Sequence, residues 1–208
     1  MEIIPGILEK DWAEIERKIN LVKPFVKVMH IDIIDGKFFP NTTFLDPAPF
    51  AKYKDLFLEL HMMVENPIQY LKPFADVGFK RFIGHIEHMP DQVEFVAQAQ
   101  LLGEVGLAVD GPTDLSAIKV GYEDLDEVLI MTIKAGASGQ KFNPEYLRKI
   151  EILRQAQGDI KIGVDGGIND KTIIEAKNAG ANRFISTSFI FGAQDPQGQY
   201  NLLENAIR

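Results

Sequence analysis

The feature that most constrains the fold is an alternation, repeated along the whole chain, between short apolar runs and segments with helical spacing. The apolar runs span residues 3–7, 25–34, 57–63, 81–83, 105–109, 128–133, 160–164 and 183–186. Helical patterns begin at Asp11, running toward Leu21, and at Pro67, and others span 90–102, 114–120, 145–157 and 199–207. One more helix ends at Ala179, and Asn169 or Asp170 is expected to cap its start. Sustained alternation predicts a parallel sheet covered by helices. About eight such units predict an α/β fold, a closed (β/α)8 TIM barrel, with an open doubly wound sheet as the alternative.

Length and charge fit one such domain with a small-molecule partner. The chain has 208 residues, close to the lower limit of roughly 200 for this barrel. It contains no linker or low-complexity tract, so we expect a single domain over residues 1–208. The 22 Lys and Arg against 30 Asp and Glu give a net charge of −8. That balance argues against a nucleic-acid partner, which requires a basic face, and leaves a local anion pocket possible.

Cysteine is absent from the sequence, which excludes disulfides and thiolate metal ligands. The first residues lack the basic and apolar regions of a signal peptide. No stretch approaches the roughly 18 apolar residues that a membrane span requires. We therefore expect a cytoplasmic protein with no membrane partner.

Polar side chains interrupt several apolar runs near their carboxyl ends. His30 and Asp32 are two residues apart and share one face of a strand, His61 lies within the third strand, and Asp165 directly follows the seventh. Functional residues of a barrel gather at the carboxyl ends of its strands. Two imidazoles and two carboxylates suit one divalent metal ion, Zn, Fe(II), Mn or Co. The alternative is that each residue is a hydrogen-bonded part of the barrel.

Other polar residues near strand ends have simpler interpretations. His85 and Glu87 share a face, and form either a support for the metal site or a structural pair. Asp35 precedes Gly36, so we expect it to support a turn. His88 precedes Met89 and a proline, which places it at the entry of a helix.

Glycine-rich loops after the last three strands suggest a phosphate site. The candidate residues are Lys134, Gly136, Ser138 and Gly139 after the sixth strand, Gly166 and Gly167 after the seventh, and Thr187 and Ser188 after the eighth. Loops at these positions of a barrel often bind phosphate through backbone N–H groups, which glycine lets a ligand approach closely. Lys134 is either an anion contact or an ordinary solvated lysine.

The sequence resembles the ribulose-phosphate 3-epimerase family across nearly its whole length. The matching segments are HIDIIDGKFFPN at 30–41, LHMMVENP at 60–67, VDGGI at 164–168, AGAN at 179–182 and IFG at 190–192. The resemblance implies a TIM barrel of the ribulose-phosphate-binding type and one divalent metal ion. The motifs place the metal ligands on His30, Asp32, His61 and Asp165, and two methionines near the metal on Met63 and Met131.

The same resemblance implies an isomerase that inverts a carbon next to a ketone. Such a reaction removes a proton from one face of the carbon and returns one to the other face. The family's acid–base pair maps to Asp32 and Asp165, and the metal would act as a Lewis acid toward the enediolate oxygens. The implied reaction is epimerisation at C3 of a ketose phosphate in the pentose phosphate pathway. D-ribulose 5-phosphate, giving D-xylulose 5-phosphate, is the first candidate substrate.

The departures from the family pattern fall on expected substrate contacts. Gly6 stands where the family usually has serine, Ile34 where it has methionine, and Thr187 where it has glycine. The loop at 134–140 reads KAGASGQ in place of NPGFGGQ. A ketohexose 6-phosphate of the allulose or fructose type is therefore an alternative substrate.

Two other functional classes remain as alternatives. Lyases and decarboxylases of similar barrels use an Asp-x-Lys-x-x-Asp strand, and the corresponding stretch from His30 to Asp35 has no lysine. A barrel that binds a sugar phosphate without turnover is the non-enzymatic alternative, although it would need no acid–base pair. We also expect a homo-oligomer. Phe38, Phe39 and Phe44 are either interface residues or a wall over the active site.

Overall fold

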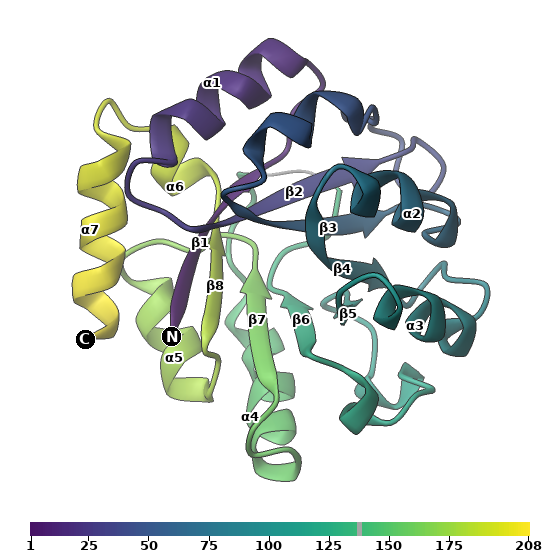
Figure 1. The fold of residues 1–208 in the computed structure, drawn as a ribbon. Coiled ribbons are helices and arrows are strands. Elements are labelled where there is room, and N and C mark those ends of the chain that lie inside the picture. The colour runs from purple at the N-terminus through teal and green to yellow at the C-terminus, as the bar shows by residue number, and fades with distance from the viewer. Residues whose placement is uncertain (137–138) are drawn as a thin grey trace.

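Eight parallel strands form a closed barrel, as the alternation predicted. The structure is a computed structural model that describes residues 1–136 and 139–208. Its strands are β1 (Glu2–Ile7), β2 (Val28–Ile34), β3 (Phe57–Met63), β4 (Phe79–His85), β5 (Glu104–Val109), β6 (Glu127–Met131), β7 (Lys161–Asp165) and β8 (Arg183–Ser186). Each strand pairs with the next one in the chain, and β8 pairs with β1 to close the barrel (Figure 1). The open doubly wound sheet is thereby excluded.

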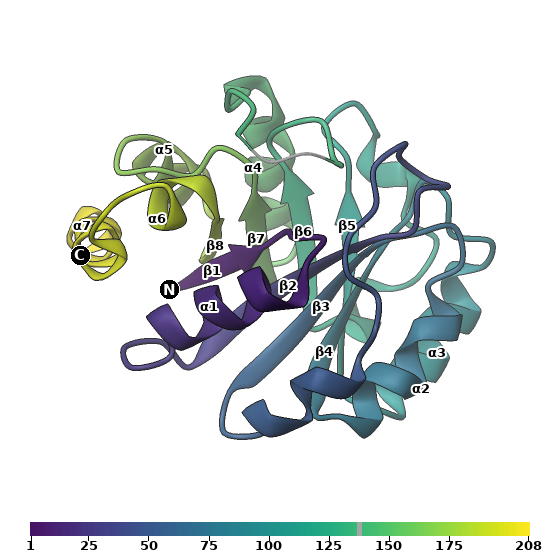
Figure 2. The same ribbon diagram turned by 90° about the horizontal axis from the view of Figure 1, so that it is seen from above.

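Helices lie outside the ring of strands, as both ribbon views show (Figures 1 and 2). They are α1 (Trp12–Val22), α2 (Ile68–Asp76), α3 (Gln92–Gln100), α4 (Leu147–Ala156), α5 (Thr172–Ala179), α6 (Ser188–Phe191) and α7 (Pro196–Ile207). Short 3-10 turns occur at η1 (Ala48–Tyr53), η2 (Leu115–Ala117), η3 (Tyr122–Asp124) and η4 (Pro144–Tyr146). None of the helices in the described part of the chain is long and apolar enough to cross a membrane.

The helices begin where the sequence supplies caps. Asp11 accepts a hydrogen bond from the backbone N–H of Glu14, as expected for the start of α1, and Asp91 does the same at α3. Such a cap satisfies a backbone donor that the first helical turn leaves unpaired, and is worth about 1 kcal/mol. Asp195 caps α7, which begins at Pro196, three residues before the predicted start.

One predicted helix was wrong, and one open choice of cap is decided. The helix expected over 114–120 is only the short turn η2, because the Asp114 side chain accepts from Ser116 N–H and the backbone is already extended at Ile118. Of the two candidates for the cap of α5, Asn169 and Asp170, the structure selects Asn169, whose side chain lies just before the helix. The Asn169 side chain accepts from the N–H groups of Lys171 and Thr172, at 2.9 and 3.1 Å.

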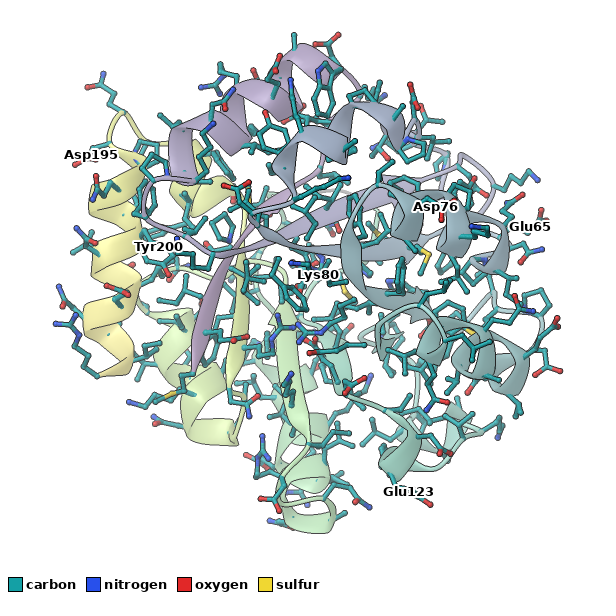
Figure 3. The ribbon with its side chains drawn as sticks, in the orientation of Figure 1. Glu65, Asp76, Lys80, Glu123, Asp195 and Tyr200 are labelled. Carbon is teal, nitrogen blue, oxygen red and sulfur yellow. The ribbon has the colours of Figure 1, made fainter. Side chains whose placement is uncertain are left out.

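The apolar core has an outer and an inner part. The outer part lies between strands and helices and includes Phe82, Phe95 and Phe184, all fully buried. The inner part fills the barrel toward the carboxyl ends of the strands and includes Ile34, Leu129 and other apolar side chains. Charged residues such as Glu65, Asp76, Glu123 and Asp195 point away from the barrel, as Figure 3 shows. This arrangement leaves the carboxyl ends of the strands to carry the polar residues of a site.

Candidate active site

Strand register brings together the two histidines and two aspartates that the sequence singled out. Asp32 on β2 lies beside His61 on β3. His61 Nδ1 is 2.8 Å from Asp32 Oδ1 and 3.8 Å from Asp165 Oδ2, and His30 Nε2 is 3.3 Å from Asp32 Oδ1. One ligand atom from each of the four residues lies within 4.8 Å of all the others. The four side chains therefore surround a space of the size that one metal ion occupies.

The chemistry of this cluster fits a divalent cation. His30 and His61 are fully buried, and within the described residues their Nε2 atoms have no hydrogen-bond partner. A buried polar atom without a partner costs free energy, typically about 1–3 kcal/mol. His30 Nε2 faces Asp32, so a cation between them would supply the missing partner. Two nitrogen and two carboxylate ligands suit Zn, Mn, Fe(II) or Co.

The two aspartates differ in their affinity for protons. Burial alone would raise the pKa of Asp32, but the adjacent His30 and His61 outweigh it and lower the pKa to about 2. Burial and the neighbouring Asp32 carboxylate raise the pKa of Asp165 to about 7. At neutral pH the metal-free site therefore holds one ionised carboxylate beside one that retains a proton about half the time. Carboxyl groups whose environments push their pKa values apart are suited to act as base and acid.

A pocket opens directly onto this pair. Both aspartates line it, together with Met63, Met131, Ile133 and Ile185. Its other described lining residues are Leu8, Gly136, Gly139, Gly166, Gly167, Ile168, Thr187 and Ser188. The cavity thus joins an acidic end, an apolar wall and the loops that follow the last three strands.

Most of the expected substrate contacts line this cavity, and two do not. The members in the lining are Met63, Gly136, Gly139, Gly166, Gly167, Thr187 and Ser188. Lys134 is exposed and lies outside the lining, as far as the described residues define it. Ser138 lies outside the described residues. Gly6 is buried behind Thr187, where a Cβ atom on Gly6 would be 2.5 Å from Thr187 Oγ1.

Gly166 and Gly167 shape the loop that follows Asp165. Both have positive φ angles, 117° and 68°, which side-chain-bearing residues rarely adopt. A Cβ atom on Gly166 would also lie 2.5 Å from the Ile133 side chain. The loop can therefore pack tightly and expose backbone to the cavity only with glycine at these positions.

Two aromatic side chains pack next to His85, beside the candidate metal site. Phe38 stacks on Phe39 with ring centroids 4.1 Å apart and contacts the rings of His85 and His88. Asp35 supports their loop, as expected, because Oδ1 accepts from Lys37 N–H at 2.9 Å. Neither Phe38 nor Phe39 is among the described residues that line the pocket, so the choice between an active-site wall and an interface stays a prediction.

Phe44 lies elsewhere in the molecule. Its ring is 5.7 Å from that of Trp12, at the start of α1. It therefore packs in the outer layer and takes no part in the packing of Phe38 and Phe39.

His85 and Glu87 form a hydrogen-bonded pair beside the site. His85 Nδ1 is 3.0 Å from Glu87 Oε2, and Glu87 Oε1 accepts from Asp110 N–H at 2.7 Å. Burial would raise the pKa of Glu87, but the contacts with His85 and Asp110 outweigh it and lower the pKa to about 2. The His85 ring stacks on His61 with centroids 4.9 Å apart. The pair thus packs against a residue of the candidate metal site.

Sequence reasoning missed a layer of charged residues inside the barrel. Glu59, Arg81, Glu127 and Arg183 are all at most 3% exposed and lie on β3, β4, β6 and β8. A signal for them exists in the sequence. Glu59 is two residues before His61, so it points to the same side of its strand. Arg81 has the same relation to Ile83, and Arg183 to Ile185, and both of those residues face the barrel interior.

Comparison with known proteins identifies the family. The sequence model of the ribulose-phosphate 3 epimerase family matches residues 2–191. The chain belongs to the ribulose-phosphate 3-epimerase family. It is 33% identical to ribulose-phosphate 3-epimerase of Schizosaccharomyces pombe, over 99% of this chain and 93% of that protein. It is also 33% identical to the cytoplasmic isoform from Oryza sativa, over 99% and 94%. The epimerase of Aquifex aeolicus is 32% identical, over 99% and 96%.

Membership of this epimerase family makes the chain a carbohydrate isomerase of a family that uses a divalent metal ion. Solved structures confirm the barrel. 3-Hexulose-6-phosphate synthase from Salmonella typhimurium aligns with a TM-score of 0.74 at 15% identity, over 100% of this chain and 98% of that one. 3-Keto-L-gulonate-6-phosphate decarboxylase from Vibrio cholerae aligns with a TM-score of 0.71 at 12% identity, over 99% of this chain and 96% of that one. At these identities the likeness concerns the fold alone.

Proposed function

We propose that the protein epimerises C3 of a ketose phosphate, with D-ribulose 5-phosphate as first substrate and D-xylulose 5-phosphate as product. The observation that carries the proposal is the pair Asp32 and Asp165. Both face one cavity, from strands three places apart around the barrel, and their pKa values are about 2 and about 7. Family membership supports the same reaction.

Inversion at C3 requires one carboxyl group that accepts a proton and another that donates one. At neutral pH Asp32 is ionised and is the group ready to accept a proton from C3. Asp165, whose pKa of about 7 in the metal-free site is the higher of the two, is the group that would donate a proton to the other face. In the reverse direction the two aspartates exchange these roles, which a reversible epimerisation requires.

We assign the metal ligands to His30, Asp32, His61 and Asp165, which supply the N₂O₂ donor set described above. The ion, Zn, Fe(II), Mn or Co, would supply Lewis-acid stabilisation of negative charge on substrate oxygens. The two imidazoles differ in their affinity for protons. Burial would lower the pKa of His30, but Asp32 and Glu59 outweigh it and raise the pKa well above its ordinary value, so a cation would replace that proton. The pKa of His61 falls to about 4, through burial and the neighbouring histidines, which outweigh Asp32. That side chain is therefore neutral and has a free nitrogen lone pair at physiological pH.

For substrate binding we propose the loops at the other end of the cavity. Backbone N–H groups of Gly136, Gly139, Gly166 and Gly167, with the hydroxyls of Thr187 and Ser188, would bind the phosphate. Met63 would contact the apolar side of the sugar. Gly6 would act by leaving room for Thr187. Lys134 and Ser138 belong to the segment that also contains Gly136 and Gly139, and they complete the proposed set of substrate-binding residues.

Solvent-deuterium exchange tests the function directly. Protein loaded with Co²⁺ or Zn²⁺ is mixed with D-ribulose 5-phosphate in D₂O, with a chelated sample as control. We expect NMR to show metal-dependent deuterium at C3 and accumulation of D-xylulose 5-phosphate. Exchange only with a ketohexose 6-phosphate would keep the proposed reaction but change the proposed substrate. No exchange with any ketose phosphate would refute the function and favour a binding protein.

We also propose that residues 1–208 form one domain, and that the protein is cytoplasmic and homo-oligomeric. The single closed barrel supports one domain, and the similarity to the cytoplasmic isoform from rice supports a cytoplasmic location. The exposed apolar side chains Val93 and Leu101, 60% and 84% exposed, support a contact between copies at α3. Neither a nucleic acid nor a membrane is among the proposed partners. Size-exclusion chromatography with light scattering would measure the oligomeric state.

A further inference from the structure

Beneath the candidate metal site, the barrel interior contains the charged layer of Glu59, Arg81, Glu127 and Arg183. Glu59 Oε2 accepts hydrogen bonds from Arg81 Nη1 at 2.7 Å and Arg183 Nη2 at 2.6 Å. Glu127 Oε2 accepts from Arg183 Nη1 and lies 3.4 Å from Arg81 Nη1. Two carboxylates thus face two guanidinium groups inside the barrel, and each arginine also contacts one partly exposed glutamate, Glu104 for Arg81 and Glu2 for Arg183.

Stability alone does not account for this layer. Apolar side chains of similar volume often stabilise a protein interior as well as a buried ion cluster does, or better, because ions must give up their hydration. The contacts of the two glutamates, however, differ. Glu59 Oε1 lies 2.7 Å from His30 Nδ1, whereas Glu127 Oε1 has no hydrogen-bond partner within the described residues. Glu59 is therefore the member of the layer that contacts a proposed metal ligand.

We propose that Glu59 is a positioning residue that orients His30 for metal binding. This inference rests on the proposed metal site. Two guanidinium groups hold Glu59 as a carboxylate, which only accepts hydrogen bonds, so His30 Nδ1 carries the hydrogen between them. The other ring nitrogen, Nε2, is thereby directed at Asp32, 3.3 Å away. Carboxylates that fix the tautomer and angle of a ligating imidazole in this way strengthen metal binding.

The strands give this contact a rigid frame. His30 and Glu59 are register partners on β2 and β3, and Glu59 and Arg81 are partners on β3 and β4. Arg81 and Arg183 contact Glu59 from two directions, so its side chain has little freedom to turn away from His30. The contacts with β3, β4 and β8 thus fix the position of the Glu59 carboxylate, and with it the orientation of the His30 imidazole.

The test compares Glu59→Gln with Glu127→Gln. Both substitutions remove one buried carboxylate from the same two arginines, but only Glu59 contacts His30. Co²⁺ is the probe, because its visible absorption reports coordination geometry and its affinity can be measured by competition with a chelator. We expect Glu59→Gln to weaken Co²⁺ binding roughly 10–100-fold and to alter the absorption spectrum. Glu127→Gln should leave both unchanged, although it destabilises the fold.

A second variant distinguishes a loss of metal binding from a folding defect. Glu59→Asp keeps the negative charge for the arginines but shortens the side chain by one methylene, which withdraws it from His30. We expect it to unfold at nearly the wild-type temperature without metal and still to bind Co²⁺ more weakly.

Each outcome decides between the alternatives. Equal losses of Co²⁺ affinity in Glu59→Gln and Glu127→Gln, or wild-type affinity in both Glu59 variants, would overturn the positioning role. Failure of the wild-type protein to bind Co²⁺ would overturn both this inference and the proposed metal site. Selective loss of Co²⁺ in the Glu59 variants, in a protein that epimerises no ketose phosphate, would support the inference and refute the proposed function.

Discussion

Removal of Arg183 from the charged layer should destabilise the fold severely. Arg183 is 1% exposed and hydrogen-bonds to both Glu59 and Glu127 inside the barrel. In Arg183→Met, Arg81 alone would face two buried carboxylates. Removal of one member of a buried ion pair typically costs about 3–5 kcal/mol, because the remaining charge loses its partner without regaining water. Two remaining partners place Arg183→Met at the upper end of this range.

The free energy of unfolding is measured by urea titration of the metal-free protein at pH 7. The double variant Arg183→Met with Glu127→Leu removes one charge of each sign and fills the space with apolar atoms. It should recover most of the lost free energy, because Glu59 keeps Arg81 as its partner. A loss below about 1 kcal/mol in Arg183→Met, within the usual effect of a substitution away from such networks, would refute the reasoning.

The pH dependence of the same variant provides a second check. Burial raises the pKa of Glu127, and Arg183 acts against this rise. Without Arg183 the pKa of Glu127 should rise further. A carboxyl group whose pKa is higher in the folded than in the unfolded protein contributes stability at low pH and loses it as pH rises through the folded value. Relative to wild type, Arg183→Met should therefore lose stability more steeply as pH rises above the ordinary pKa of a glutamate. An identical pH profile would contradict the assignment.

Three further predictions concern the site. Asp165→Asn should lower the rate of C3 deuterium exchange roughly 10²–10⁴-fold, while equilibrium dialysis shows that a substrate analogue still binds. Gly6→Ala should destabilise the protein by about 1–3 kcal/mol, since its Cβ would be 2.5 Å from Thr187 Oγ1; thermal unfolding should show partial recovery when Thr187→Gly is added, and no recovery would place the strain elsewhere. Co²⁺ affinity should fall at least about tenfold per pH unit below pH 7, because Asp165, with its pKa of about 7, and His30, whose pKa the neighbouring carboxylates raise, must each lose a proton to bind a cation. Titration calorimetry at pH 5.5, 6.5 and 7.5 measures this slope, and a flat profile would contradict it.

Local patterns were sufficient to predict the barrel. Buried parallel strands are apolar on both faces, and helices that cover them are apolar on one, so both types of element are visible in the chain. The one predicted helix that is absent lies in a segment too short to show a helical period. In residues 114–120 the Asp114 side chain instead caps the three-residue turn at Leu115–Ala117.

The sequence by itself also showed which polar side chains lie toward the carboxyl ends of the strands, and this predicted that His30, Asp32, His61 and Asp165 meet at one end of the barrel, which the structure confirms. Only the tertiary structure decided what lies beneath them. Glu59 and Arg183 are 124 residues apart in the chain, and closure of β8 onto β1 brings them into contact. The partner of a buried charge depends on the stagger of all eight strands, a property that no local pattern encodes.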